Sequence, residues 1–235
     1  MNTVKYSIVI PCYNEGPNLP LILARFAEVL AGKENIEIIL VNNGSTDNSS
    51  QILRELLPTY PFAKVVDVEI NQGYGFGILA GLKESKGQFV GWTHADMQTD
   101  PKDVLRAIDL IETTDSTRIF IKGNRKNRPW FDSFFTVGMS LFECILLGTW
   151  LWDINAQPTL FHRTFMTEWK NPPNDFSLDL FAIYHAKKGH YSILRFPVKF
   201  PPRIHGVSHW NTGLLAKWKF IKRTLVFSFQ LKKTI

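Results

Sequence analysis

Short β-branched and apolar runs alternate with helix-like patterns through the first half of the chain. Apolar residues at spacings of three and four predict helices over 19–30, 47–57 and 74–86. Asp100 followed by Pro101 predicts a further helix start, because Asp accepts hydrogen bonds from unpaired N–H groups of a first turn. The β-branched runs predict five strands, over 4–10, 36–41, 64–70, 88–93 and 118–122. This order predicts an α/β fold with a mostly parallel sheet covered by helices on both faces.

The second half of the chain is less regular. Its pattern predicts helices over 131–152 and 179–187, strands over 159–161 and 191–196, and a last helix from Asn211. The stretch 134–152 is apolar enough to be considered as a membrane span, but Glu143 lies at its middle. A carboxylate at the centre of a bilayer is costly, so the sequence favours a buried helix or one lying at an interface.

Each of the first four predicted strands ends in a cluster of small, polar or acidic residues. Turn chemistry alone accounts for any one of them. Ligands of parallel sheets bind beyond the carboxyl ends of the strands, so four clusters together favour a binding crevice. Glycines 73, 75 and 77 match a phosphate-binding fingerprint only weakly, because that motif follows the first strand of a domain. The clusters are Pro11-Cys12-Tyr13-Asn14-Glu15, Asn42-Asn43-Gly44-Ser45-Thr46-Asp47, Asn71-Gln72-Gly73-Tyr74-Gly75 and His94-Ala95-Asp96-Met97-Gln98.

Composition narrows the class of protein. The 235 residues are 45% hydrophobic and carry a net charge of +6, which excludes a disordered chain and suits one sizeable domain. Residues 180–235 contain eleven Lys and Arg and no acid, whereas the preceding part is mildly acidic. This asymmetry predicts an anionic partner: nucleic acid, a phosphorylated ligand or a membrane surface. Cys12 and Cys144 are far apart, and no secretory signal opens the chain, so a disulfide framework, a zinc site and export are not expected.

In order and spacing, the four clusters resemble the motifs of glycosyltransferase family 2. Within it, the chain is most similar to the dolichyl- and polyprenyl-phosphate mannose and glucose synthases. The likeness continues through Gly123-Asn124-Arg125, 153–163 and 197–208, and so covers most of 5–210. The resemblance implies a GT-A fold, an α/β nucleotide-sugar-binding domain, over 1–210. We expect a basic amphipathic helix over 211–235.

The cluster after the fourth strand corresponds to the family's metal-binding motif. The resemblance implies that Asp96 and Gln98 hold Mg²⁺ or Mn²⁺, and such hard cations prefer oxygen ligands. His94 stands where the family has its first acid, so metal binding is expected to be weaker or different in geometry. Three interpretations of His94 stay open: it contacts a phosphate, it acts through water, or it is only a strand-end residue.

The resemblance also implies a site for a nucleotide-sugar donor. Its base and ribose are expected at Glu15 and at Asn42 and Asn43, where most relatives carry Asp instead of the Asn pair. An amide both donates and accepts hydrogen bonds, whereas a carboxylate only accepts them, so the choice between UDP- and GDP-linked donors stays open. The residues expected to bind the donor are Pro11, Tyr13, Glu15, Asn42, Asn43, Gly73, His94, Ala95 and Asp96.

Two arginines match family positions that meet phosphate, and a guanidinium suits phosphate geometry. Arg203 lies in a segment that resembles the Arg-x-x-Gly-x-Ser motif, which closes over donor and acceptor phosphates. Asp153 is expected near the acceptor, with a helix cap as the alternative. The residues expected at the acceptor and phosphates are Arg125, Arg128, Asp153, Gln157, Arg203 and Ser208, and the catalytic residues are Asp96, Arg125 and Arg203.

The acceptor is inferred from a missing acidic pair. Family members that transfer sugar to a hydroxyl usually carry such a pair late in the domain as the general base, but Asp175 and Asp179 are single. A phosphate monoester needs no base, because its second pKa is near ~6. This favours inverting transfer to a polyprenyl phosphate, inversion being what the resemblance implies. The alternatives are Asp179 as a base in transfer to a saccharide hydroxyl during cell-surface polysaccharide synthesis, and a non-catalytic nucleotide-sugar-binding relative.

A lipid acceptor requires access to a membrane. The aromatic helices over 134–152 and 214–229, flanked by cations, suit an interface, with core helices as the alternative. We therefore expect a peripheral protein on the cytoplasmic face of the membrane. No aromatic stacking motif or recognition helix appears, so nucleic acid is not an expected partner.

Overall fold

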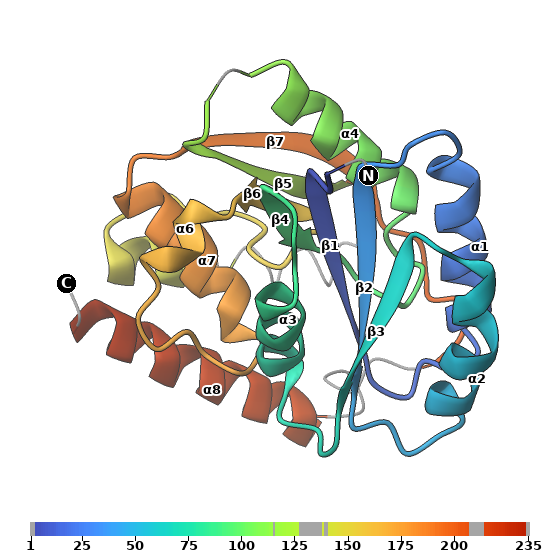
Figure 1. The fold of residues 1–235 in the computed structure, drawn as a ribbon. Coiled ribbons are helices and arrows are strands. Elements are labelled where there is room, and N and C mark those ends of the chain that lie inside the picture. Colours follow the sequence, from blue (N-terminus) through green and yellow to red (C-terminus); the bar gives the residue numbers. More distant parts are fainter. Residues whose placement is uncertain (1–2, 115, 127–137, 139–140, 207–213, 234–235) are drawn as a thin grey trace.

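The computed structural model describes residues 3–114, 116–126, 138, 141–206 and 214–233. Seven strands form one sheet in the order β3-β2-β1-β4-β6-β5-β7 (Figure 1). All neighbouring pairs are parallel except those made by β6, which runs antiparallel to both β4 and β5. The strands are β1 (Tyr6–Cys12), β2 (Ile36–Asn43), β3 (Ala63–Val68), β4 (Phe89–Trp92), β5 (Ile119–Lys126), β6 (Thr159–His162) and β7 (Ser192–Lys199).

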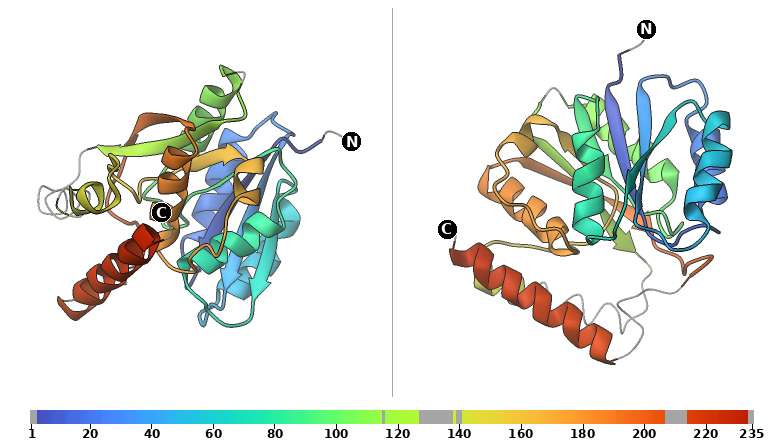
Figure 2. Two further views of the ribbon diagram at one scale, coloured as in Figure 1. Left: turned by 90° about the vertical axis from the view of Figure 1, so that its left-hand side faces the viewer. Right: turned by 60° about the horizontal axis from the view of Figure 1, so that its bottom comes forward.

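Helices cover both faces of the sheet (Figures 1 and 2). One face packs against α1, α2 and α4, and the other against α3, α6 and α7. Covering both faces explains why the central strands are apolar at successive positions instead of alternating. The helices are α1 (Leu19–Val29), α2 (Ser49–Leu56), the 3₁₀ turn η1 (Leu57–Thr59), α3 (Tyr74–Lys83), α4 (Pro101–Glu112), α6 (Thr164–Thr167), α7 (Ser177–Lys188) and α8 (Leu214–Lys233).

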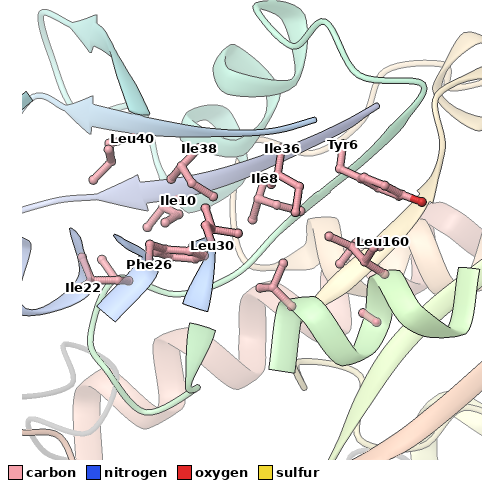
Figure 3. Packing of buried hydrophobic residues seen from close by; sticks show 14 of the residues in the cluster. Tyr6, Ile8, Ile10, Ile22, Phe26, Leu30, Ile36, Ile38, Leu40 and Leu160 are labelled. Atoms are coloured by element: carbon pink, nitrogen blue, oxygen red, sulfur yellow. The ribbon is translucent and has the colours of Figure 1, made fainter. Parts of the chain in front are cut away.

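Strand β1 shows how the two cores are divided. Tyr6, Ile8 and Ile10 point into one core, which also contains Phe26 of α1 (Figure 3). Val9 points to the opposite face, into the core that contains α3 and α7. Because all four side chains are fully buried, β1 is held between two layers of helices, and the loop that follows it is fixed in position.

The predicted α/β architecture is confirmed, and every predicted strand is present. The Asp100 prediction is also confirmed, because its side chain accepts a hydrogen bond from the Lys102 backbone at the start of α4. The predicted helix over 131–152 is too long at its carboxyl end: residues 141–147 are helical, whereas 149–152 are not. Gly148, with φ of 62°, stands where that helix stops. The part of this prediction that falls on 131–137 and 139–140 lies outside the described residues.

Helix α8 packs against the domain near α7. Leu231 is buried in the core that contains α7, and the Ser228 hydroxyl lies 2.6 Å from the carboxylate of Glu143, which is itself buried in the 141–147 helix. One stretch of α8 therefore contacts protein rather than solvent. None of the helices that the structure describes is both long enough and apolar enough to span a bilayer.

Candidate active site at the carboxyl edge of the sheet

The predicted clusters meet at one edge of the sheet. Six of the seven strands are parallel, so the segments that follow β1, β2, β3 and β4 leave the sheet at the same edge, as do the ends of β5 and β7. Two loops at this edge contain residues with left-handed backbone, Asn14 (φ 56°) and Met97 (φ 58°). Such conformations cost roughly 1–3 kcal/mol and persist where surrounding contacts hold them.

Arg203 links the segment after β7 to the cluster after β4. Its Nη2 lies 2.8 Å from Oδ2 of Asp96, and its Nε donates to Oε1 of Gln98 at 3.2 Å. Gln98 in turn donates from Nε2 to the Pro201 carbonyl at 2.9 Å, which holds the two segments together. The Asp96 carboxylate is buried, whereas the Arg203 side chain keeps 25% of its surface exposed. The two predicted metal ligands and one predicted phosphate ligand therefore lie together.

Glu15 lies in the same electrostatic environment. Its carboxylate accepts a hydrogen bond from Asn18 at 2.6 Å. Burial raises the pKa of Glu15; the Asn18 bond opposes this rise, the charge of Asp96 adds to it, and the charge of Arg203 opposes it. The Glu15 carboxylate thus lies within electrostatic range of Asp96 and Arg203.

The Asn pair at the end of β2 has one atom of each side chain engaged. Asn42 Nδ2 donates to Ser50 (2.7 Å) and to Asp67 (2.8 Å), and Asn43 Nδ2 donates to the Gly73 carbonyl (2.8 Å). Both Oδ1 atoms are buried without a hydrogen-bond partner among the residues that the structure describes. Buried unpaired acceptors are costly, so both amides keep an unmet hydrogen-bonding demand beneath this edge.

The backbone at Gly73 packs against another segment of the chain and does not form an open phosphate-binding loop. Its φ is 106°, and a Cβ there would lie 2.5 Å from the Asn174 carbonyl. The same carbonyl accepts a hydrogen bond from Phe76 in the first turn of α3. The glycine run therefore lets the segment before α7 lie against the start of α3.

His94 lies beside a pair of stacked aromatic rings. Its ring is 5.9 Å from that of Tyr74, which stacks on Phe176 at 4.6 Å. Burial lowers the pKa of His94; the carboxylates of Asp96 and Asp179 oppose this, and the site arginines add to it. We therefore expect a neutral imidazole near pH 7. Of the remaining predicted donor residues, Pro11 and Tyr13 are half-buried at the same edge, and Ala95 is buried.

Arg125 and Asp153, both predicted near phosphate or acceptor, bind each other. The Asp153 carboxylate accepts from the Arg125 backbone N–H and from its Nε, each at 2.7 Å, and also contacts Nη2. Burial opposes ionisation of Asp153, but the charge and hydrogen bonds of Arg125 outweigh it and hold the pKa of Asp153 below its ordinary value. Asp153 therefore orients Arg125. Among the described residues, the Asp153 side chain makes no helix-cap contact. The predicted residues Arg128 and Ser208 lie outside the part of the chain that the structure describes.

A buried polar network beneath the edge was not predicted. Oδ1 of Asp179 accepts hydrogen bonds from Gln157 Nε2 (2.8 Å), Lys122 Nζ (3.1 Å) and Trp92 Nε1 (3.3 Å). Thr159 closes the ring by donating to Gln157 Oε1 and accepting from Lys122. Any contact of Gln157 with an acceptor would have to compete with these bonds. A lysine directly after the apolar run Ile119-Phe120-Ile121 of β5 was the sequence signal for this network.

The donor set at Asp96 and Gln98 fits a hard divalent cation. Both side chains offer oxygen, the ligand that Mg²⁺ and Mn²⁺ prefer. The Arg203 guanidinium, itself a cation, lies against both oxygens. The place is thus already suited to positive charge.

Comparison with known proteins identifies related sequences. The family model described as "Glycosyl transferase family 2" matches residues 7–178. An uncharacterized glycosyltransferase of Bacillus subtilis is 33% identical over 129 residues, which is 54% of this chain and 40% of that protein. The undecaprenyl-phosphate 4-deoxy-4-formamido-L-arabinose transferase of Pseudomonas savastanoi is 34% identical over 129 residues, 53% of this chain and 37% of that protein. The matched part thus spans well under half of these relatives.

Solved structures share the fold. Glucosyl-3-phosphoglycerate synthase from Mycobacterium tuberculosis, in complex with Mn²⁺, UDP and glucosyl-3-phosphoglycerate, superposes with a TM-score of 0.74 at 15% identity, covering 99% of this chain and 81% of that one. A mannosyltransferase from Pyrobaculum calidifontis, in complex with GDP-Man and Mn²⁺, gives 0.72 at 18% identity, covering 100% and 66%. At these identities the likeness concerns the fold.

Proposed function

Because the chain belongs to glycosyl transferase family 2, we propose that this glycosyltransferase moves a sugar from a nucleoside diphosphate to the phosphate of a polyprenyl lipid, with inversion at the anomeric carbon. The observation that carries the donor half of the proposal is the contact of Arg203 with Asp96 and Gln98 beside Glu15. This group combines a guanidinium for phosphate with oxygen ligands for a cation, which is what a departing diphosphate requires.

Chain residues bind the donor and stabilise the charge that develops on it. Asn42 and Asn43, at the end of β2, lie beside the nucleobase, and Glu15 takes ribose hydroxyls. Asp96 and Gln98 hold Mg²⁺ or Mn²⁺, which supplies positive charge to the diphosphate when bound. This assignment is supported by the donor set, and related folds are known with Mn²⁺ and a nucleotide. Arg203 binds the phosphate oxygens of the leaving group.

The acceptor half rests on how the carboxylates are engaged. A hydroxyl acceptor needs a base within hydrogen-bond reach. Asp179 is buried and bonded to Lys122, and Asp175 pairs with Arg223 at 3.2 Å. An ionised phosphate monoester needs no such base. It needs cations, and Arg125, held by Asp153, lies near the edge. The undecaprenyl-phosphate transferases among the relatives agree with such an acceptor.

The membrane-facing part of the proposal rests on exposed apolar side chains. Leu141 and Ile145 of the 141–147 helix and Val226 and Phe229 of α8 are exposed, and the rings of Phe142 and Phe229 lie 6.2 Å apart. The one acid of the 141–147 helix, Glu143, is buried. Exposed apolar side chains suit insertion at the surface of a membrane. Residues 180–235 contain basic but no acidic residues, which suits the anionic cytoplasmic face. We propose that residues 1–210 form the catalytic domain and that 211–235 dock it there.

A transfer assay tests the donor half. Radiolabelled UDP- and GDP-sugars are offered with polyprenyl phosphate and Mn²⁺, and label is counted in the lipid phase. Asp96→Asn should remove most of the transfer, and chelation should do the same. The matched control is Glu112→Gln, another carboxylate paired with a cation but outside the site, which should retain activity. Nucleotide-sugar binding without transfer to any acceptor would instead identify a non-catalytic relative.

Vesicle binding tests the membrane part. Ile145→Glu combined with Phe229→Glu changes exposed side chains only, and should reduce sedimentation with vesicles that contain anionic lipid. Leu21→Glu on α1 places the same charge at another exposed apolar position and serves as the control. Equal sedimentation of all three proteins would contradict docking through this surface.

A further inference from the structure

The Arg203 guanidinium occupies the position that a cation shared by Asp96 and Gln98 would need. Its nitrogens lie 2.8 Å from Asp96 Oδ2 and 3.2 Å from Gln98 Oε1. Mg²⁺ bonds oxygen at about 2.0–2.1 Å, so an ion bound to the same two oxygens would overlap the guanidinium. A cation and Arg203 therefore exclude each other at these atoms.

Electrostatics explains why Arg203 holds this place. Asp96 is buried, and a buried carboxylate is unstable without a counter-charge. Glu15 adds a second carboxylate within electrostatic range of Asp96, whose charge adds to the rise that burial causes in the pKa of Glu15. Arg203 supplies the only positive charge that directly contacts the Asp96 carboxylate among the residues that the structure describes.

Two features allow the Arg203 side chain to move away from Asp96. Its side chain keeps a quarter of its surface in solvent. Gln98 holds the segment through the Pro201 carbonyl at 2.9 Å, a bond that does not involve the guanidinium. The side chain can therefore swing away while the backbone beside it stays attached.

We propose that Arg203 is an internal counter-cation of the metal site, which the divalent metal displaces and the donor diphosphate then captures. This inference rests on the proposed function and adds to it the order in which metal and donor bind. Metal alone must break the Arg203–Asp96 pair and should bind weakly. Metal together with a nucleoside diphosphate gives the released guanidinium a new anionic partner, so the two ligands should strengthen each other's binding. Arg203 thus couples loading of the metal to loading of the donor.

Mn²⁺ titration tests the inference, with free Mn²⁺ measured by electron paramagnetic resonance, first without nucleotide and then with UDP or GDP. Arg203→Gln removes the competing cation, so we expect Mn²⁺ alone to bind roughly tenfold more tightly than to the wild type. The strengthening of Mn²⁺ binding by the nucleotide should shrink in the same variant. Arg106→Gln, which breaks a similar pair with Asp103 on α4, should leave both values unchanged.

The outcomes separate the two proposals. Wild-type binding of Mn²⁺ and nucleotide with an unchanged Mn²⁺ affinity in Arg203→Gln overturns the inference and leaves the proposed function standing. Failure of every protein to bind Mn²⁺, with or without nucleotide, overturns both. If Arg203→Gln does not fold, Arg203→Lys replaces it, because an ammonium retains the charge but lacks the planar fork that spans both oxygens. It should show a smaller gain in Mn²⁺ affinity, and no gain overturns the inference.

Discussion

Raising the pH from 4.5 to about 7 should weaken the attachment of α8, because Glu143 lies in its contact as a neutral acid. The Ser228 hydroxyl lies 2.6 Å from Glu143 Oε1 and 2.8 Å from the Thr224 carbonyl. That hydroxyl has one hydrogen and cannot donate to both. If Ser228 donates to Thr224, protonated Glu143 can donate to Ser228, while its other oxygen, Oε2, is buried without a partner among the described residues. Burial accordingly raises the pKa of Glu143 to about 7.

The size of the stability loss follows from the protonation of Glu143 in the folded and in the unfolded state. The pKa of Glu143 is about 7 in the folded protein against an ordinary value of 4.5. The folded state therefore holds a proton that the unfolded state has lost between these pH values, and stability falls as the pH rises through this window. At 1.36 kcal/mol per pH unit, the loss amounts to about 3 kcal/mol and is complete above pH 7.

The assay compares the wild type with Glu143→Gln, whose amide can still donate to Ser228 but cannot ionise. Urea unfolding at pH values from 5 to 8.5 gives the difference in free energy of unfolding, in which other titrating groups cancel. We expect the Gln variant to gain about 2–3 kcal/mol relative to the wild type across this range. Glu112→Gln, at an exposed carboxylate, should show no such trend. Parallel curves for wild type and Glu143→Gln would refute the reasoning.

Two further predictions concern stability. Lys122→Met leaves Asp179 buried without its counter-charge and should cost about 3–5 kcal/mol in urea unfolding, most of it recovered by adding Asp179→Asn; a loss below about 1 kcal/mol would contradict this account of the pair. Gly73→Ala should cost about 1–3 kcal/mol through backbone strain and more through the clash with Asn174. Gly32→Ala has a similar positive φ with nothing within 4 Å, so equal melting temperatures for the two variants would exclude the clash.

The sheet and its functional edge were predictable because local patterns determine them. The β-branched runs predicted the strands. Parallel pairing of β1 with β2 and with β4 then places the polar ends of these strands at one edge. Glu15 and Asp96 follow β1 and β4 at this edge and influence each other electrostatically. The antiparallel entry of β6 between β4 and β5 was not predictable, since a four-residue strand carries no signal for its neighbours or direction.

Contacts between distant segments were beyond the sequence patterns. Arg203 and Asp96 were each singled out, but as ligands of phosphate and metal, and their pairing depends on how the segment after β7 crosses the edge. The cost of Glu143 in an apolar stretch was recognised, whereas its partner Ser228 lies 85 residues away. Buried polar pairs of this kind are specified by packing, which no local pattern encodes.

The central claim is that the acceptor is a lipid phosphate, and a paired acceptor assay tests it most directly. The full chain is given labelled nucleotide sugars with either polyprenyl phosphate or the corresponding polyprenol, which differ only in the phosphate. We predict label on polyprenyl phosphate, lost in Asp96→Asn, and none on polyprenol, because Asp175 and Asp179, the candidate bases in the described part of the chain, are both paired with cations. Label that appears on polyprenol but not on polyprenyl phosphate would contradict the account.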